Sequence, residues 1–150
     1  MEKTKVLVGL ASCGIAAGAN KVYDKLKALQ EADKLDIVLK RTGCIGMCYR
    51  EPLVEVIDET GSYLYGEINE DKAVDIFDKH LKQGEPVKDY VVKSDLFETI
   101  DDPFWQGQVK IALRKCGVID PENIDEYVEL DGYKALGKIL KEKMNQEHSE

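Results

Sequence analysis

Three cysteines, Cys13, Cys44 and Cys48, are the residues whose type and spacing most clearly suggest chemistry in this chain. Cys44 and Cys48 are separated by three residues, in a segment that also contains Gly43 and Gly46. Thiolates gathered from two loops, with glycines that let the backbone wrap closely, suit a soft metal or an iron–sulfur cluster. Two thiolates at this spacing can bind one iron, while a distant pair would hold the second iron of a [2Fe–2S] cluster. The sequence therefore predicts a thiolate site whose fourth ligand it does not identify.

Packing is the alternative role for each cysteine, because free cysteine behaves as a small hydrophobic residue. Cys13 directly follows an apolar stretch and opens a predicted helix, where free backbone amides stabilise a thiolate. Cys116 shares an apolar helical stripe with Val109, Ala112 and Leu113. This stripe favours packing of Cys116 over a role as the fourth ligand.

The elements that must position the cysteines begin with a strand, a helix and a second strand. Residues 4–10 are apolar and β-branched, which predicts a buried strand. Apolar positions three and four apart predict an amphipathic helix over residues 16–32. Residues 35–40 alternate as a strand and lead into the loop that carries Cys44 and Cys48.

A hairpin and a second helix follow the cysteine loop. We expect a strand over residues 53–57, with Pro52 just before it, where a missing N–H is tolerated. Residues 58–61 have the composition of a turn, and residues 62–68 form the hairpin partner. Asn69 caps the next helix, which ends at Gln83 and Gly84.

The resulting order is β-α-β-β-β-α, which predicts an α/β protein with a mixed sheet and two helices. This order resembles the thioredoxin-like arrangement, in which the loops after the first two strands can lie at the same end of the sheet. We expect residues 1–84 to form this domain, residues 85–102 to be a connector, and residues 103–150 to form a small helical segment.

Three helices are expected in the C-terminal segment. The first carries the stripe that includes Cys116 and ends at Gly117. Asp120 caps the second, with Pro121 in its first turn. The third runs from Tyr133 to Met144. Phe104 and Trp105 precede these helices and are interpreted as packing residues.

The charge and hydropathy of the chain exclude several classes of protein. It contains 21 Lys and Arg against 29 Asp and Glu, a net charge of −8, and it has no basic stripe. We therefore expect no nucleic-acid partner. The longest apolar stretch, residues 6–19, is too short and too interrupted for a membrane span.

Free cysteines that serve as metal ligands are typical of a cytoplasmic protein. An alternative is that residues 1–13 form a short lipoprotein signal, with Leu10, Ala11 and Ser12 before Cys13. Glu2 and the short apolar segment argue against a signal peptide.

Other catalytic patterns are weak. Two histidines leave little from which to build a nucleophilic triad or dyad, and the glycines do not reproduce a dinucleotide or phosphate-binding loop. His80 lies near the end of a predicted helix, where interaction of its cation with the helix dipole explains it. His148 lies in the polar tail.

At the residues described above, the chain resembles the N-terminal part of the NADH-oxidising flavoprotein subunits of soluble hydrogenases, formate dehydrogenases and relatives of respiratory complex I. Residues 4–84 are similar to the thioredoxin-like [2Fe–2S] ferredoxin domain, most specifically in residues 42–54. Residues 96–140 resemble the entry segment of the flavoprotein, notably residues 109–117 and 125–136.

The resemblance implies a [2Fe–2S] cluster with Cys13, Cys44 and Cys48 as metal ligands. It also implies a fourth cysteine about five residues before Cys13, where this chain has Val8 and Gly9. Ser12 is the nearest oxygen donor in the sequence. The chain ends before the glycine-rich segment that holds FMN and NADH in such subunits, so we expect no FMN or NAD site here.

Two functions are consistent with these expectations. The first is an electron-transfer module of an NADH-dependent oxidoreductase, which relays single electrons between flavoprotein and iron–sulfur subunits. In that case the chain is a subunit or fragment, and catalysis belongs to its partners. The second is a cluster-free, thioredoxin-like docking module that organises such a complex.

Overall fold

The computed structural model describes residues 3–96, 99, 103, 105 and 107–141. Their central element is a five-stranded sheet with the strand order β2-β1-β3-β4-β5. The strands are β1 (Lys5–Gly9), β2 (Val38–Thr42), β3 (Val54–Ile57), β4 (Ser62–Tyr65) and β5 (Val91–Ser94). β1 and β2 are parallel, whereas each remaining pair is antiparallel, so the sheet is mixed as predicted.

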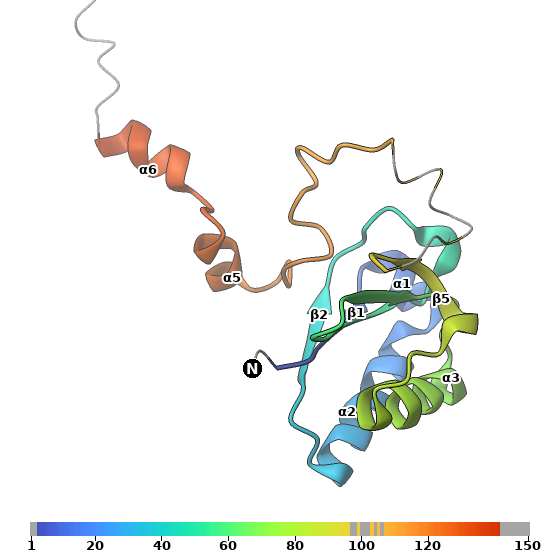
Figure 1. Cartoon of the computed structure of the whole chain (residues 1–150). Helices are drawn as coiled ribbons and strands as arrows, with labels where there is room; N and C mark the ends of the chain where they lie inside the picture. Colours follow the sequence, from blue (N-terminus) through green and yellow to red (C-terminus); the bar gives the residue numbers. More distant parts are fainter. Residues whose placement is uncertain (1–2, 97–98, 100–102, 104, 106, 142–150) are drawn as a thin grey trace, which may run out of the picture.

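Helices cover one face of this sheet (Figure 1). They are α1 (Ser12–Ala17), α2 (Ala19–Asp33) and α3 (Glu70–Asp75), which continues as the π-helix η2 (Ile76–Leu81). The predicted single helix over residues 16–32 is divided, because Gly18 adopts a left-handed φ of 101° between α1 and α2. Asn69 caps α3 as predicted, since its side chain accepts a hydrogen bond from the backbone N–H of Lys72.

Alternation along the strands divides the apolar side chains between the two faces of the sheet. The main core lies between the sheet and the helices, and its buried members include Val6, Val22, Leu26, Val56 and Phe77. A smaller cluster lies on the opposite face and consists of Met47, Leu53, Leu64 and Val92, with Ile45 and Trp105 packed against it. The packing role predicted for Trp105 is therefore confirmed, while Phe104 lies outside the described residues.

The turn between β3 and β4 is joined to the end of η2 through a buried histidine. Asp58 accepts hydrogen bonds from the backbone of Thr60 and Gly61, which closes the predicted turn. His80 is only 2% exposed, and burial lowers its pKa. The expectation of a charged histidine stabilised by the helix dipole is wrong, because this ring lies inside the main core beside Tyr65.

The segment predicted as a connector contributes to the sheet. It contains a 3-10 turn, η3 (Lys88–Tyr90), and the edge strand β5. Sequence reasoning missed this strand because it is only four residues long and lies in a segment of mixed charge, and because pairing with β4 determines its conformation.

The C-terminal segment is less helical than predicted. Turns replace the helix expected before Gly117, and Val109 is 85% exposed, so no apolar stripe is buried there. The next helix, α5 (Ile124–Glu129), is capped by Asn123 rather than by Asp120. The last, α6 (Lys134–Lys141), lies within the predicted range 133–144, whose final residues are outside the described part.

Specific polar contacts attach this segment to β2. Lys40 pairs with Glu126 at 2.8 Å, and the hydroxyl of Thr42 donates to the carbonyl of Ile119 at 3.2 Å. α5 and α6 extend away from the sheet (Figure 1). None of the described helices is both long and apolar enough to cross a membrane.

Candidate metal centre

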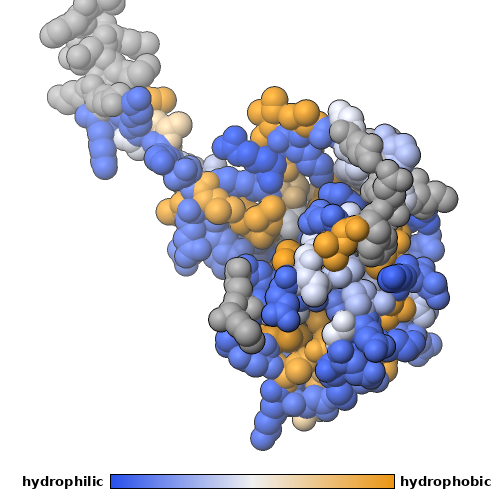
Figure 2. Space-filling view, in the orientation of Figure 1, coloured by the Kyte–Doolittle hydropathy of each residue, from blue (hydrophilic) through white to orange (hydrophobic). Residues whose placement is uncertain are grey.

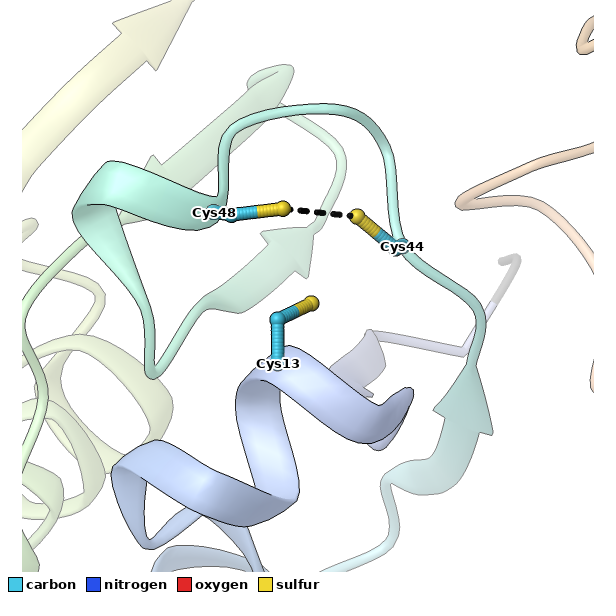
Figure 3. Close-up of side chains that lie close together, drawn as sticks. All are labelled: Cys13, Cys44 and Cys48. Carbon is cyan, nitrogen blue, oxygen red and sulfur yellow. Dashed lines mark hydrogen bonds between the residues drawn. The ribbon is translucent and has the colours of Figure 1, made fainter.

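The three predicted ligands come together at one end of the sheet. Cys13 lies in the first turn of α1, directly after β1, and Cys44 and Cys48 lie in the loop after β2. Because β1 and β2 are parallel neighbours, the loops that follow them start at the same end of the sheet. The three sulfur atoms lie within 4.8 Å of one another, and those of Cys44 and Cys48 are 3.4 Å apart (Figure 3).

The cysteine loop is shaped by one glycine and one buried methionine. Gly46 has a left-handed φ of 94°, and its backbone N–H donates to the sulfur of Cys44 at 3.3 Å. Such a donor stabilises a thiolate. Met47 is wholly buried in the smaller cluster and anchors the loop between the two cysteines. Burial of one such side chain contributes about 1.5–3 kcal/mol.

A second contact holds this loop from outside. The ammonium of Lys110 donates to the carbonyl of Ile45 at 2.7 Å and lies 4.9 Å from the ring centre of Trp105. A side chain on Gly117 would meet Ile45 at 2.5 Å, so the C-terminal segment passes close to the loop. Lys110 and Gly117 thus support the cysteine loop on its outer side.

The thiol of Cys13 is hard to ionise in this setting. Burial, followed by its contacts with the thiols of Cys44 and Cys48, raises the pKa of Cys13 to about 12. Metal binding requires thiolates and releases their protons, so a cation between the sulfurs would reverse this preference. The donor set of three close thiols fits a thiophilic metal or an iron–sulfur cluster.

Glu51 is a member of the site that sequence reasoning missed. Its Oε1 lies 3.5 Å from the sulfur of Cys13, and its Oε2 accepts a hydrogen bond from the backbone N–H of Leu53 at 2.9 Å. Burial raises the pKa of Glu51, while that backbone hydrogen bond opposes the shift. Its position three residues after Cys48 was the available signal.

The other candidates for a fourth ligand are less well placed. Ser12 is exposed at the start of α1. Cys116 is half-buried in the C-terminal segment and does not belong to the described group of close cysteine, histidine and acidic ligands.

Comparison with known proteins gives three informative matches in sequence. A 33-residue segment is 58% identical to the NADP-reducing hydrogenase subunit HndC of Solidesulfovibrio fructosivorans, over 22% of this chain but only 7% of that subunit. The NADP-reducing hydrogenase subunit HndB of the same organism is 28% identical over 88 residues, which are 57% of this chain and 70% of that subunit. Ferredoxin, 2Fe-2S, of Clostridium pasteurianum is 33% identical over 79 residues, which are 50% of this chain and 76% of that ferredoxin.

Solved structures agree with these sequence matches. A thioredoxin-like [2Fe-2S] ferredoxin from Aquifex aeolicus superposes with a TM-score of 0.57 at 24% identity, over 63% of this chain and 94% of the ferredoxin. A 1.5 Å structure of the wild-type ferredoxin gives a TM-score of 0.56 at 25% identity, over 62% and 99%. No protein-family model matches the chain. The predicted thioredoxin-like α/β fold is confirmed.

Proposed function

Because this chain belongs to the thioredoxin-like [2Fe–2S] ferredoxin family, we propose that it is an electron-transfer module that binds a [2Fe–2S] cluster through Cys13, Cys44 and Cys48. The observation that carries the proposal is the meeting of three thiols from two loops within 4.8 Å. When bound, such a cluster supplies one-electron redox chemistry.

The loops give the protein's residues distinct tasks. Cys44 and Cys48 form one close pair on a loop anchored by Met47, and Cys13 faces them from α1 (Figure 3). The N–H of Gly46 donates to the sulfur of Cys44, and such a hydrogen bond would tune the reduction potential of iron bound there. The fold therefore supplies rigid positioning and hydrogen bonding.

Access to the site supports exchange of electrons with a partner protein. Cys48 is exposed, and two apolar side chains beside candidate ligands are exposed as well: Ile15 at 45% and Tyr49 at 55%. Exposed apolar residues beside a functional site are typical of a docking surface. We propose that a redox partner approaches the site at these residues.

The partner that we propose is a flavoprotein or iron–sulfur subunit of an NAD(P)H-dependent oxidoreductase. The matches to two subunits of an NADP-reducing hydrogenase support this assignment. The flavin and nicotinamide chemistry would then belong to the partner, and this chain would relay single electrons. Four free cysteines support a reducing compartment such as the cytoplasm.

A cluster-free docking module is the second candidate, and the C-terminal segment favours it. Exposed apolar residues gather over α5 and the segment before it (Figure 2). They include Val118, Ile124 and Val128, each more than half exposed. Such a surface suits assembly whether or not the site carries a cluster.

Anaerobic purification followed by iron and acid-labile sulfide analysis distinguishes the two functions. The electron-transfer module should contain about two irons and two sulfides per chain and show thiolate-to-iron absorption in the visible range. A folded protein that stays colourless and iron-free after anaerobic reconstitution would instead support the docking module. Zinc in place of iron would also contradict the electron-transfer proposal, because zinc has no redox chemistry.

A further inference from the structure

We propose that the carboxylate of Glu51 is the fourth ligand of this site, so that the cluster is held by three thiolates and one carboxylate. This inference rests on the proposed function and adds to it the identity of the missing ligand. It explains how a chain with three clustered cysteines can complete a four-ligand site.

The donor atoms form two close pairs. The sulfurs of Cys44 and Cys48 are 3.4 Å apart, and the sulfur of Cys13 lies 3.5 Å from Oε1 of Glu51. Two ligands that share one tetrahedral metal at a bond length of about 2.3 Å lie roughly 3.7 Å apart. A [2Fe–2S] cluster needs one such pair for each iron. Cys44 with Cys48, and Cys13 with Glu51, meet this requirement.

The two oxygens of Glu51 have different environments. Oε2 accepts a hydrogen bond from the backbone N–H of Leu53 at 2.9 Å, and Leu53 is buried in the smaller core cluster. The hydrogen bond from Leu53 orients the carboxylate so that its other oxygen, Oε1, faces the sulfur of Cys13. A ligand whose second oxygen is held in this way is oriented before any metal binds.

Two glycines leave the space that the carboxylate occupies. A Cβ on Gly9, at the end of β1, would lie 3.3 Å from both oxygens of Glu51. A Cβ on Gly14 would lie 3.0 Å from Oε2 and 2.1 Å from the carbonyl of Gly9. Gly9 needs no left-handed conformation, so its lack of a side chain serves the approach of Glu51 rather than a turn.

The charge of the donor set is also appropriate. An ionised carboxylate contributes one negative charge, as a thiolate does, so three thiolates and Glu51 supply the same four negative charges as four cysteines. The hydroxyl of Ser12 is exposed, and it would have to lose a proton far less acidic than that of a carboxylic acid to supply the same charge. Among the described residues, Glu51 is the acid placed in contact with one of the three thiols.

The test compares reconstituted wild-type protein with three variants: Glu51→Gln, Glu51→Cys, and Gly9→Cys combined with Glu51→Ala. The double variant places a thiol on the Cβ that points to the space vacated by the carboxylate. Glu67→Gln is the matched control, because Glu67 pairs with Arg50 in the same region but outside the site. Each protein is assayed for iron and sulfide, for resistance to a chelator, and for the EPR spectrum of the reduced state; circular dichroism reports folding.

We expect the Glu51→Gln variant to lose its cluster to the chelator at least roughly tenfold faster than the wild type. Removal of a group that supports a metal site typically has an effect of this size. Glu51→Cys and the double variant should retain iron and sulfide with EPR g values shifted from those of the wild type, because one oxygen ligand becomes sulfur. Glu67→Gln should behave as the wild type.

A folded Glu51→Gln variant with wild-type g values and chelator resistance would overturn the assignment. If that variant does not fold, Glu51→Cys decides: wild-type g values there would show that residue 51 does not touch iron. A wild-type protein that takes up no cluster at all would contradict the proposed function itself, which is a different result from a cluster indifferent to Glu51.

Discussion

Nε2 of His80 donates to the carboxylate of Asp58 at 2.9 Å, and Nδ1 of the same ring accepts from the hydroxyl of Tyr65 at 2.7 Å. This arrangement ties the β3–β4 turn to η2 through a neutral imidazole. His80 and Tyr65 are buried, so the two ring nitrogens of His80 obtain their hydrogen bonds from Asp58 and Tyr65 rather than from water.

The stability of the protein should fall as the pH is lowered from neutrality. Burial lowers the pKa of His80 below 6.5, and hydrogen bonds from Thr60 and His80 lower the pKa of Asp58 despite its own burial. Below about pH 6.5 the unfolded chain binds a proton on His80 that the folded chain does not, so stability decreases. Protonation of Asp58 at lower pH acts in the same direction.

Urea unfolding at several pH values measures this effect. His80→Leu should cost about 1–3 kcal/mol at neutral pH, because it removes the hydrogen bond to Asp58 and the one to the buried hydroxyl of Tyr65. The same substitution should also reduce the decrease in the free energy of unfolding between about pH 7 and pH 5, because the titrating group is gone. Glu59→Gln, an exposed neighbour of Asp58, should leave both quantities unchanged. A variant at His80 with the wild-type pH profile would contradict this account.

Substitution of the cysteines should separate ligands from packing residues. Cys13→Ser, Cys44→Ser and Cys48→Ser should each bleach the visible absorption or strongly weaken the cluster, since serine is a poor substitute for a soft thiolate. Cys116→Ala should keep the spectrum, because Cys116 lies outside the close group. Retained colour in both loop variants, Cys44→Ser and Cys48→Ser, would refute the ligand assignment.

Met47 should couple the stability of the fold to retention of the cluster. Met47→Ala removes a wholly buried side chain from the smaller hydrophobic core and should lower the free energy of unfolding by about 2–5 kcal/mol. Because Met47 lies between two proposed ligands, the folded variant should also lose iron to a chelator faster than the wild type. Met47→Leu, a swap of similar volume, is the control and should retain most of both properties.

The exposed residues beside the site should affect electron exchange rather than the cluster. Tyr49→Glu and Ile15→Glu should slow reduction by the partner flavoprotein, because each places a charge on a proposed apolar contact. Their visible spectra and iron contents should match the wild type. Glu59→Gln again serves as a distant surface control, and stopped-flow reduction is the measurement. Unchanged rates in both variants would place the docking surface elsewhere.

The apolar side of α6 should matter for assembly. Leu136, Ile139 and Leu140 are three and four residues apart, and each is exposed. Ile139→Asp should change the free energy of unfolding by no more than about 0.5 kcal/mol, because this side chain is on the surface. We expect it to weaken binding of the partner subunit in co-purification, whereas Lys138→Gln should not. Full retention of the partner by Ile139→Asp would exclude α6 from the interface.

The amino-acid sequence by itself determined most of the secondary structure and the cysteine site of this protein. Apolar runs and turn residues predicted the first four strands and the helices against them, because those patterns reflect burial on one face. The spacing of Cys44 and Cys48, with glycines around them, indicated a thiolate site, since ligand chemistry depends on residue type and local reach. The same local signals predicted the caps at Asn69 and Gly84.

Only the tertiary structure decided where the long-range contacts lie. β5 is a strand because β4 pairs with it. The residues before Gly117 form turns, and Val109, Ile111 and Leu113 stay exposed, so no buried apolar face supports a helix there. His80 is neutral because the fold buries it between Asp58 and Tyr65. Glu51 joins the site because the end of β1 leaves room at Gly9, a juxtaposition of residues 42 positions apart that no local pattern encodes.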